Sequence, residues 1–151
     1  MIRGIHHIAV HVHDIDRMIA FYRDAFGFEA MAEPFAFEKY EALDRVMDTP
    51  GSAARIALLK AGNCYIEMFQ FSAPAGGETA PRRPIDKGYT HFCIDVTDIA
   101  AEYTRLKALG MTFGADAPVD TGYVIAVYGR DPEGNIIEIQ ETPGDSAMEL
   151  P

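Results

Sequence analysis

Cysteine is scarce in this chain of 151 residues, which contains only Cys64 and Cys93. A disulfide scaffold needs more cysteines in a shorter chain, so this class of small secreted protein is excluded. We interpret both cysteines as reduced residues of the core or of a cavity in a cytosolic protein.

Long apolar stretches and basic residues are also few. No apolar run approaches the ~20 residues that span a bilayer, and the N-terminal residues carry no apolar signal core. The chain has 13 Lys and Arg against 23 Asp and Glu, a net charge of −10, which repels phosphate backbones. We therefore expect a cytoplasmic protein with neither nucleic acid nor a membrane as its partner.

What the chain does contain is an internal repeat. The segment from His7 to Ile15 aligns with the segment from His91 to Ile99, at an offset of 84 residues (91 − 7). Each segment alternates apolar and polar residues as a strand does, and then reaches an aspartate suited to cap a helix. Helical patterns follow over residues 14–26 and 98–109, and each stops at a glycine. Further strands are predicted near residues 29–37, 55–60 and 64–71 of the first half and 111–115, 123–128 and 136–141 of the second.

This order predicts an α+β fold of two tandem βαβββ modules within a single domain, residues 1–151. A four-stranded sheet with one outer helix leaves its other face bare, so pairing two such sheets would close a cavity. The segment 34–51 is longer than its counterpart, which indicates an inserted loop or lid. The predicted boundaries are about 3–72 for module 1, 73–88 for a linker, 89–142 for module 2 and 143–151 for a tail.

Four residues stand out as metal ligands. Because side chains on a strand alternate between faces, His7 and His91 should point away from the helices and toward the cavity. The last strand of each half carries a carboxylate with apolar residues on both sides, Glu67 or Glu138. A buried unpaired carboxylate is costly, so it usually binds a metal or a cation or has a raised pKa. Together the four side chains predict one divalent ion, and Zn, Ni, Co, Mn and Fe all accept such ligands.

The same alternation places six more residues on the cavity face, where they are candidate substrate contacts: His11, Tyr65, Phe69, Cys93, Asp95 and Gln140. Alternatives remain open for several of them. His11 can equally be a hydrogen-bonded strand residue, and the aromatic residues can belong to the core. Cys93 shows no sign of activation and is interpreted as a small apolar filler.

These motifs resemble those of the vicinal oxygen chelate superfamily. That superfamily includes glyoxalase I, methylmalonyl-CoA epimerase, extradiol dioxygenases, fosfomycin-resistance transferases and bleomycin-resistance proteins. The resemblance covers about residues 3–142 and rests on the segments His7–Asp14, Phe21–Phe28, Tyr65–Glu67, His91–Val96 and Asp131–Glu138. It implies an eight-stranded, U-shaped mixed sheet around one metal, formed within a chain or across a dimer, and we expect a homodimer.

Departures from the family pattern narrow the expected activity. Glyoxalase I typically has an arginine that helps hold glutathione where this chain has His11, and an asparagine where it has Phe71. Glutathione recognition is therefore not expected. The CoA epimerases usually have glutamine at the position of Glu67, so that resemblance is also partial.

The resemblance implies a metal-dependent lyase, isomerase or epimerase acting on a small carbonyl compound or a thioester. In this hypothesis Glu138 removes a proton next to the metal-bound carbonyl, and Glu67 is its pseudo-symmetric partner. One alternative is an Fe(II)-dependent ring-cleaving or other oxygenase. The other is a non-catalytic protein that binds a drug-like compound, although such binders generally lack the metal ligands.

Overall fold

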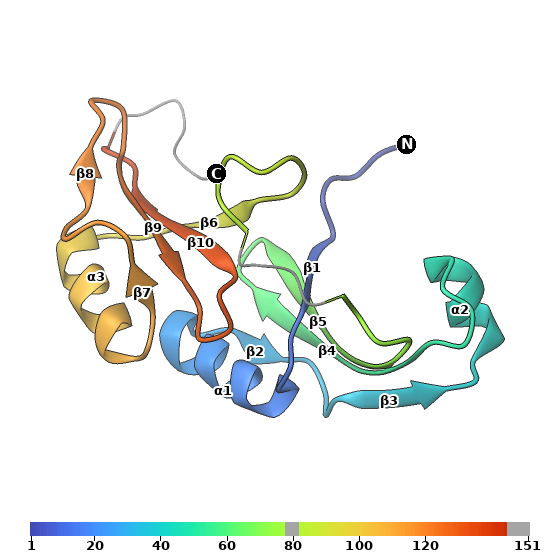
Figure 1. The fold of residues 1–151 in the computed structure, drawn as a ribbon. Helices are drawn as coiled ribbons and strands as arrows, with labels where there is room; N and C mark the ends of the chain where they lie inside the picture. The colour runs from blue at the N-terminus through green and yellow to red at the C-terminus, as the bar shows by residue number, and fades with distance from the viewer. Residues whose placement is uncertain (78–81, 145–151) are drawn as a thin grey trace. The chain divides into compact units, whose positions relative to one another are not determined.

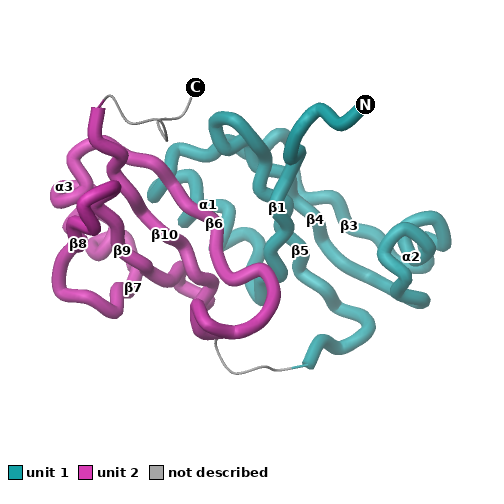
Figure 2. Tube along the Cα trace, turned by 90° about the horizontal axis from the view of Figure 1, so that it is seen from above, with its two compact units in different colours: residues 1–78 teal, residues 79–151 magenta. Residues whose placement is uncertain are grey.

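The computed structural model describes residues 1–77 and 82–144. These residues fall in two compact units, 1–78 and 79–151, which Figure 2 shows in different colours. Each unit contains one copy of the repeat and forms its own mixed sheet (Figure 1). The tandem βαβββ modules are therefore confirmed. Each sheet has five strands instead of the predicted four, because one short extra strand joins each of them.

In unit 1 the strand order is β1-β5-β4-β2, with β3 also paired to β4. Strand β1 runs parallel to β5, and the other neighbours are antiparallel. The elements are β1 (His7–His11), α1 (Ile15–Phe26), β2 (Glu29–Ala30), β3 (Phe35–Glu38), α2 (Glu41–Met47), β4 (Ala53–Ala61) and β5 (Cys64–Ala73).

Unit 2 repeats this topology with the order β6-β10-β9-β7, and β8 pairs with β9. The parallel pair is β6 with β10. The elements are β6 (His91–Asp95), α3 (Ile99–Ala108), β7 (Thr112–Phe113), β8 (Val119–Asp120), β9 (Ile125–Arg130) and β10 (Ile136–Glu141). Across the described ranges, no helix combines the length and the apolar character needed to cross a membrane.

One face of each sheet is buried under its helix. In unit 1 the apolar stripe of α1 contacts β4 and β5, and Tyr22 and Met18 are fully buried with Met68 of the sheet. In unit 2 Leu106 of α3 and Ile139 of β10 are equally inaccessible. Burying side chains of this size contributes about 1.5–3 kcal/mol each. Since adjacent residues alternate, the opposite face of each sheet is left to the polar residues of the site.

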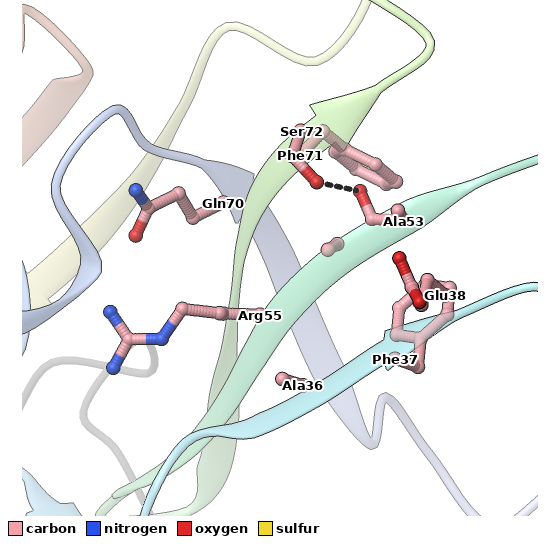
Figure 3. Close-up of a pocket in the computed structure, with 9 residues that line it drawn as sticks. Ala36, Phe37, Glu38, Ala53, Arg55, Gln70, Phe71 and Ser72 are labelled. Carbon is pink, nitrogen blue, oxygen red and sulfur yellow. Dashed lines mark hydrogen bonds between the residues drawn. The ribbon is translucent and has the colours of Figure 1, made fainter.

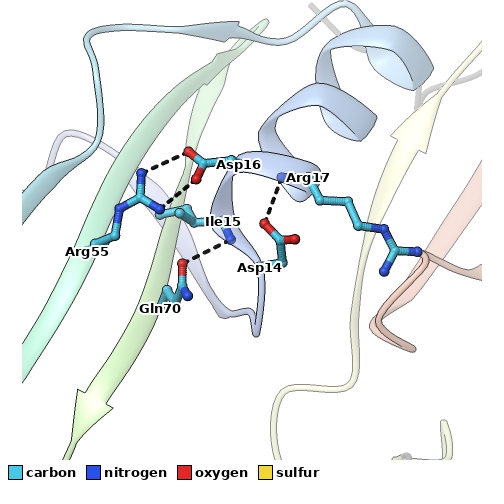
Figure 4. A network of polar contacts seen from close by, with 6 residues as sticks. All are labelled: Asp14, Ile15, Asp16, Arg17, Arg55 and Gln70. Atoms are coloured by element: carbon cyan, nitrogen blue, oxygen red, sulfur yellow. Dashed lines mark hydrogen bonds and ion pairs between the residues drawn. The ribbon is translucent and has the colours of Figure 1, made fainter.

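The start of each helix is tied to the last strand of its own module. In unit 1 the backbone amide of Ile15 donates to Gln70 Oε1 at 3.2 Å (Figure 4). In unit 2 the amide of Ile99 donates to Glu141 Oε2 at 2.9 Å. These contacts are equivalent, because the acceptors are 71 residues apart (141 − 70), as Glu67 and Glu138 are (138 − 67).

The first strands of the two modules are offset by 84 residues and the last strands by 71. The first module is therefore longer by 13 residues between these strands (84 − 71). The segment 34–51, predicted as a loop or lid, instead contains β3 and α2. The Asp44 carboxylate of α2 accepts from the amides of Gly51 at 2.8 Å and Ser52 at 2.9 Å, and from Ser52 Oγ. These contacts attach α2 to the beginning of β4.

The contacts of Asp44 make this attachment sensitive to acid. The Ser52 hydroxyl and the Gly51 amide lower the pKa of Asp44 below its usual 3.8. A carboxyl group whose pKa is lower in the folded than in the unfolded state stabilises the fold at pH values above its unfolded-state pKa. This contribution is lost as the pH falls through the folded-state pKa. An NMR titration is therefore expected to shift the Gly51 and Ser52 amides with a midpoint below 3.8. The Asp44→Asn variant, which has no carboxyl here, should lose this transition. If it persists there, another group causes it.

Gly129 in β9 occupies a position without room for a side chain. A Cβ atom there would lie 2.5 Å from Met111 Cε and 2.7 Å from Phe113 Cε1. The Phe113 ring is itself packed at 4.5 Å from Tyr103, so it has little freedom to move. Gly129→Ala is expected to destabilise the protein by about 1–3 kcal/mol through overpacking, measured by urea unfolding. Gly114→Ala, where nothing lies within 4 Å, is the matched control and should stay within about 0.5 kcal/mol of the original chain.

Candidate metal-binding site

In unit 1 a histidine and a glutamate meet on the sheet face that α1 leaves uncovered. Residues opposite each other on paired strands share a face, and Ala9 of β1 lies opposite Glu67 of β5. His7, two residues before Ala9, therefore points to the same side as Glu67. His7 Nε2 lies 3.4 Å from Glu67 Oε2.

The same arrangement recurs in unit 2. Cys93 lies opposite Glu138, and His91 Nε2 lies 3.1 Å from Glu138 Oε2. This pair is the more enclosed of the two, since the side chains of His91 and Glu138 are 26% and 17% exposed against 41% and 25% for the first pair. Charges interact more strongly where water is partly excluded, so Glu138 interacts more strongly with nearby charges than Glu67 does.

The outer nitrogens of both imidazoles have partners of their own. Thr90 Oγ1 lies 2.8 Å from His91 Nδ1, and His6 Nδ1 lies 2.9 Å from His7 Nδ1. In metal sites a histidine commonly uses one ring nitrogen as the ligand while the other is held by such a contact. The Nε2 atoms, which face the carboxylates, are thus the ones available to a cation. The donors of each module, an imidazole nitrogen and a carboxylate oxygen, are atom types that divalent metals accept.

Each module supplies two of these donors. Over residues 1–77 and 82–144, no group of three or more His, Cys, Asp or Glu side chains is gathered closely enough to hold a metal ion. A single pair falls short of the three or four protein ligands that catalytic and structural zinc sites use. Neither pair is therefore a complete site by itself.

The two glutamates have different neighbours on their own sheets. Beside Glu138, burial and then the charges of Glu138 and Asp95 raise the pKa of the Cys93 thiol to about 12, which keeps it protonated. Tyr128, opposite Glu138 on β9, places its hydroxyl 3.4 Å from His91 Nε2. In unit 1 the positions of Cys93 and Tyr128 are occupied by Ala9 and Leu58, which lie opposite Glu67. The pair in unit 2 is therefore flanked by polar groups and the pair in unit 1 by apolar ones.

The remaining predicted site residues divide by module. In unit 1 the His11 ring stands edge-on at 5.3 Å from Phe71, and Phe69 stacks on Phe71 at 5.2 Å. Tyr65 stacks on His6 at 5.1 Å. The unit 2 candidates Asp95 and Gln140 instead join a hydrogen-bond chain through Thr142, whose hydroxyl donates to Asp95 Oδ1 at 3.0 Å and accepts from Gln140 Nε2 at 3.3 Å.

Sequence reasoning missed three of these polar neighbours. The alternation pattern did not place Tyr128, Thr90 or Thr142 beside the two pairs. A signal for Thr142 existed, because it continues the alternation of Glu138 and Gln140. Thr90 had no such signal, since it precedes the strand.

A surface pocket of about 380 Å³ in unit 1 is lined by residues near the end of β3, the beginning of β4 and the end of β5, and neither His7 nor Glu67 is among them (Figure 3). Figure 3 shows Arg55 and Gln70 on one side of these strands. Both already bind the beginning of α1, because Arg55 forms a bidentate pair with Asp16 at 2.7 and 2.8 Å (Figure 4). This pocket is therefore not part of the candidate metal site. Its lining residues are Ala36, Phe37, Glu38, Ala53, Ala54, Arg55, Gln70, Phe71 and Ser72.

Comparison with known proteins identifies relatives of this chain. The model of the Glyoxalase/Bleomycin resistance protein/Dioxygenase superfamily matches residues 4–139. A 2-epi-5-epi-valiolone epimerase from Actinomyces is 29% identical over 153 residues, which cover 97% of this chain and 83% of that protein.

Two solved structures share the fold. A glyoxalase family protein from Bacillus cereus superposes with a TM-score of 0.82 at 22% identity, covering 95% of this chain and 96% of the other. The fosfomycin resistance protein FosX from Listeria monocytogenes, in complex with Mn(II) and a sulfate ion, has a TM-score of 0.63 at 18% identity. That alignment covers 96% of this chain and 94% of the other.

Proposed function

Because this chain belongs to the Glyoxalase/Bleomycin resistance protein/Dioxygenase superfamily, we propose that it is a metal-dependent isomerase or lyase, most specifically an epimerase. Its substrate in this proposal is a small carbonyl compound or a thioester, from which it moves a proton at the adjacent carbon. The observation that carries the proposal is the recurrence of one His–Glu pair at repeat-related positions of both modules. The epimerase named among the relatives supports the same kind of reaction.

His7, Glu67, His91 and Glu138 would together hold one divalent cation. This requires the pairs of two modules to face a single ion, either within one chain or between the two chains of a homodimer. Mn(II) in the FosX structure supports a divalent ion, and imidazole with carboxylate also suits Zn, Ni, Co or Fe. When bound, the cation supplies Lewis-acid polarisation of the substrate carbonyl.

The chain's own residues then move the proton. In this proposal Glu138 takes the proton from the carbon beside the carbonyl, because its carboxylate is the more enclosed of the two. Epimerisation also needs a proton to return on the opposite face of the planar intermediate. Glu67, at the equivalent position of the other module, would donate that proton from its protonated carboxyl group, and the proton taken by Glu138 would leave to solvent.

Solvent exchange tests the proposal directly. Purified protein is loaded separately with Mn, Ni, Co, Zn or Fe(II) and incubated in D₂O with small α-hydroxy ketones and with α-branched acyl thioesters. Metal-dependent entry of deuterium at the carbon next to the carbonyl is the expected result. Oxygen uptake with Fe(II) alone would support the oxygenase instead, and failure of every metal to bind would support the non-catalytic binder.

A further inference from the structure

Beyond the metal pairs, the two modules differ at one row of equivalent positions. The row lies on the same sheet faces as the pairs, one step further along the parallel strands. In unit 1 it consists of His11, Phe69 and Phe71, and in unit 2 of Asp95, Gln140 and Thr142. We call the second set the polar row.

The aromatic row of unit 1 is an internal control for the fold. Phe69 and Phe71 stack at 5.2 Å with their rings nearly parallel, at 6°, and His11 packs against Phe71. The same module therefore forms its sheet with phenylalanines at the positions of Gln140 and Thr142. The requirements of the fold alone do not explain the polar row.

The helix contacts do not explain it either. The amide of Ile99 at the beginning of α3 is bound by Glu141, which lies on the opposite face of β10 from Gln140. In unit 1 Gln70 does the same for Ile15. The polar row is thus separate from the residues that anchor the helices.

The polar row is half-buried and holds both donors and acceptors. Gln140 Nε2 donates to Thr142 Oγ1 at 3.3 Å, and Thr142 Oγ1 donates to Asp95 Oδ1 at 3.0 Å. A carboxylate offers about four acceptor sites, and a glutamine amide has two donors and an acceptor, so these two bonds use only part of the capacity. Placing a carboxylate beside Glu138 in partly excluded water is costly unless donors compensate for it.

From this asymmetry we propose that Asp95, Gln140 and Thr142 bind hydroxyl groups of the substrate, which is therefore a polyhydroxylated ketone of sugar or cyclitol size. The assignment rests on the proposed function. Hydroxyl groups both donate and accept, which matches the mixed character of the row, whereas an ammonium group only donates. Two residues along a strand separate the row from Glu138 by roughly 7 Å, so a molecule held at the metal pair needs further polar atoms beyond its carbonyl to reach it.

Two six-membered ring ketones test the assignment. In 2-keto-myo-inositol each ring carbon except the carbonyl carbon carries a hydroxyl group. In 2-hydroxycyclohexanone only one carbon beside the carbonyl does. For the metal-loaded protein in D₂O, kcat/KM for exchange is expected to be at least about 100-fold higher with the inositol derivative. With 2-hydroxycyclohexanone, the side chains of the polar row are left without hydrogen-bond partners, which weakens binding of the transition state. Equal or better exchange of 2-hydroxycyclohexanone would overturn the assignment and leave the proposed function standing.

Asp95→Ala gives the second test. It should lower kcat/KM for 2-keto-myo-inositol about 10–100-fold, mainly through KM, as expected for lost hydrogen bonds to a charged group. Exchange of 2-hydroxycyclohexanone should stay within about 2-fold, a change well below 1 kcal/mol. Asp116→Ala removes the same charge from an exposed site in unit 2 and controls for net charge. An equal loss on both ketones would reveal a structural role instead, and exchange of neither ketone by the original protein would count against the proposed function and the assignment together.

Discussion

Glu138→Gln is expected to lower the rate of deuterium exchange by about 10²–10⁴-fold, the contribution typical of a general base. Glutamine has nearly the same size and keeps an oxygen that can face His91, so the packing around β10 should persist. It cannot take a proton from carbon, however, because its amide oxygen is far less basic than a carboxylate. The measurement is exchange of the α-proton by NMR, with metal content determined in the same samples.

Glu141→Gln is the matched control on the same strand. Glu141 points to the helix side, where its carboxylate accepts from the Ile99 amide. A glutamine already performs this task in the other module, since Gln70 accepts from Ile15. The control should therefore keep the original exchange rate. An original rate in metal-loaded Glu138→Gln would remove this residue from the role of base.

Glu67→Gln extends the experiment to the other module. The proposal assigns to Glu67 the donation of a proton on the opposite face. The rate of epimerisation by this variant should therefore also fall by about 10²–10⁴-fold. If Glu67→Gln turned over at the original rate, a single carboxylate would be sufficient and the two-sided mechanism would be wrong.

Removal of either histidine should abolish stoichiometric metal binding, although His7 and His91 belong to different modules. Loss of an outer contact of a ligand typically weakens metal affinity about 10–100-fold, and loss of the ligand itself should exceed this range. His7→Ala and His91→Ala are therefore both expected to release the ion on dialysis. Metal content per chain and the shift of Tm on metal addition measure the effect, because an ion that binds only the folded state raises Tm.

His13→Ala controls for the removal of an exposed imidazole from the same part of the chain. It should retain the metal and the metal-dependent rise in Tm. If His91→Ala lost the ion while His7→Ala kept it, the module 1 pair would not belong to the site. The hypothesis of four ligands would then give way to a site built on unit 2 and other donors.

The repeat and the alternation of side chains made much of the site predictable. The offset between His7 and His91 required two equivalent strands, and their polarity required the histidines to face away from the helices. Glu67 and Glu138 followed from carboxylates that have apolar residues on both sides in their strands. The histidine and glutamate of each module lie close together, at 3.4 and 3.1 Å, and their role as ligands of one shared cation stays a prediction.

Local patterns also predicted the beginnings of the helices. Asp14 and Asp98 accept from backbone amides of the first helical turns, as expected for capping residues. The turn at Asp131 is held by its carboxylate, which accepts from the Glu133 and Asn135 amides at 2.9 Å. All these contacts join residues at most four positions apart, so the sequence alone contains the information that they require.

By itself, then, the amino-acid sequence determined the two modules, the face on which each His–Glu pair lies and the residue types that can bind a cation. Only the tertiary structure decided which side chains surround each pair. Tyr128 on β9 reaches His91 on β6 across the one strand between them, β10, and Thr142 reaches Asp95 from 47 residues away. Such contacts depend on the register between distant strands and on side-chain rotamers, which long-range packing selects and which no local pattern specifies.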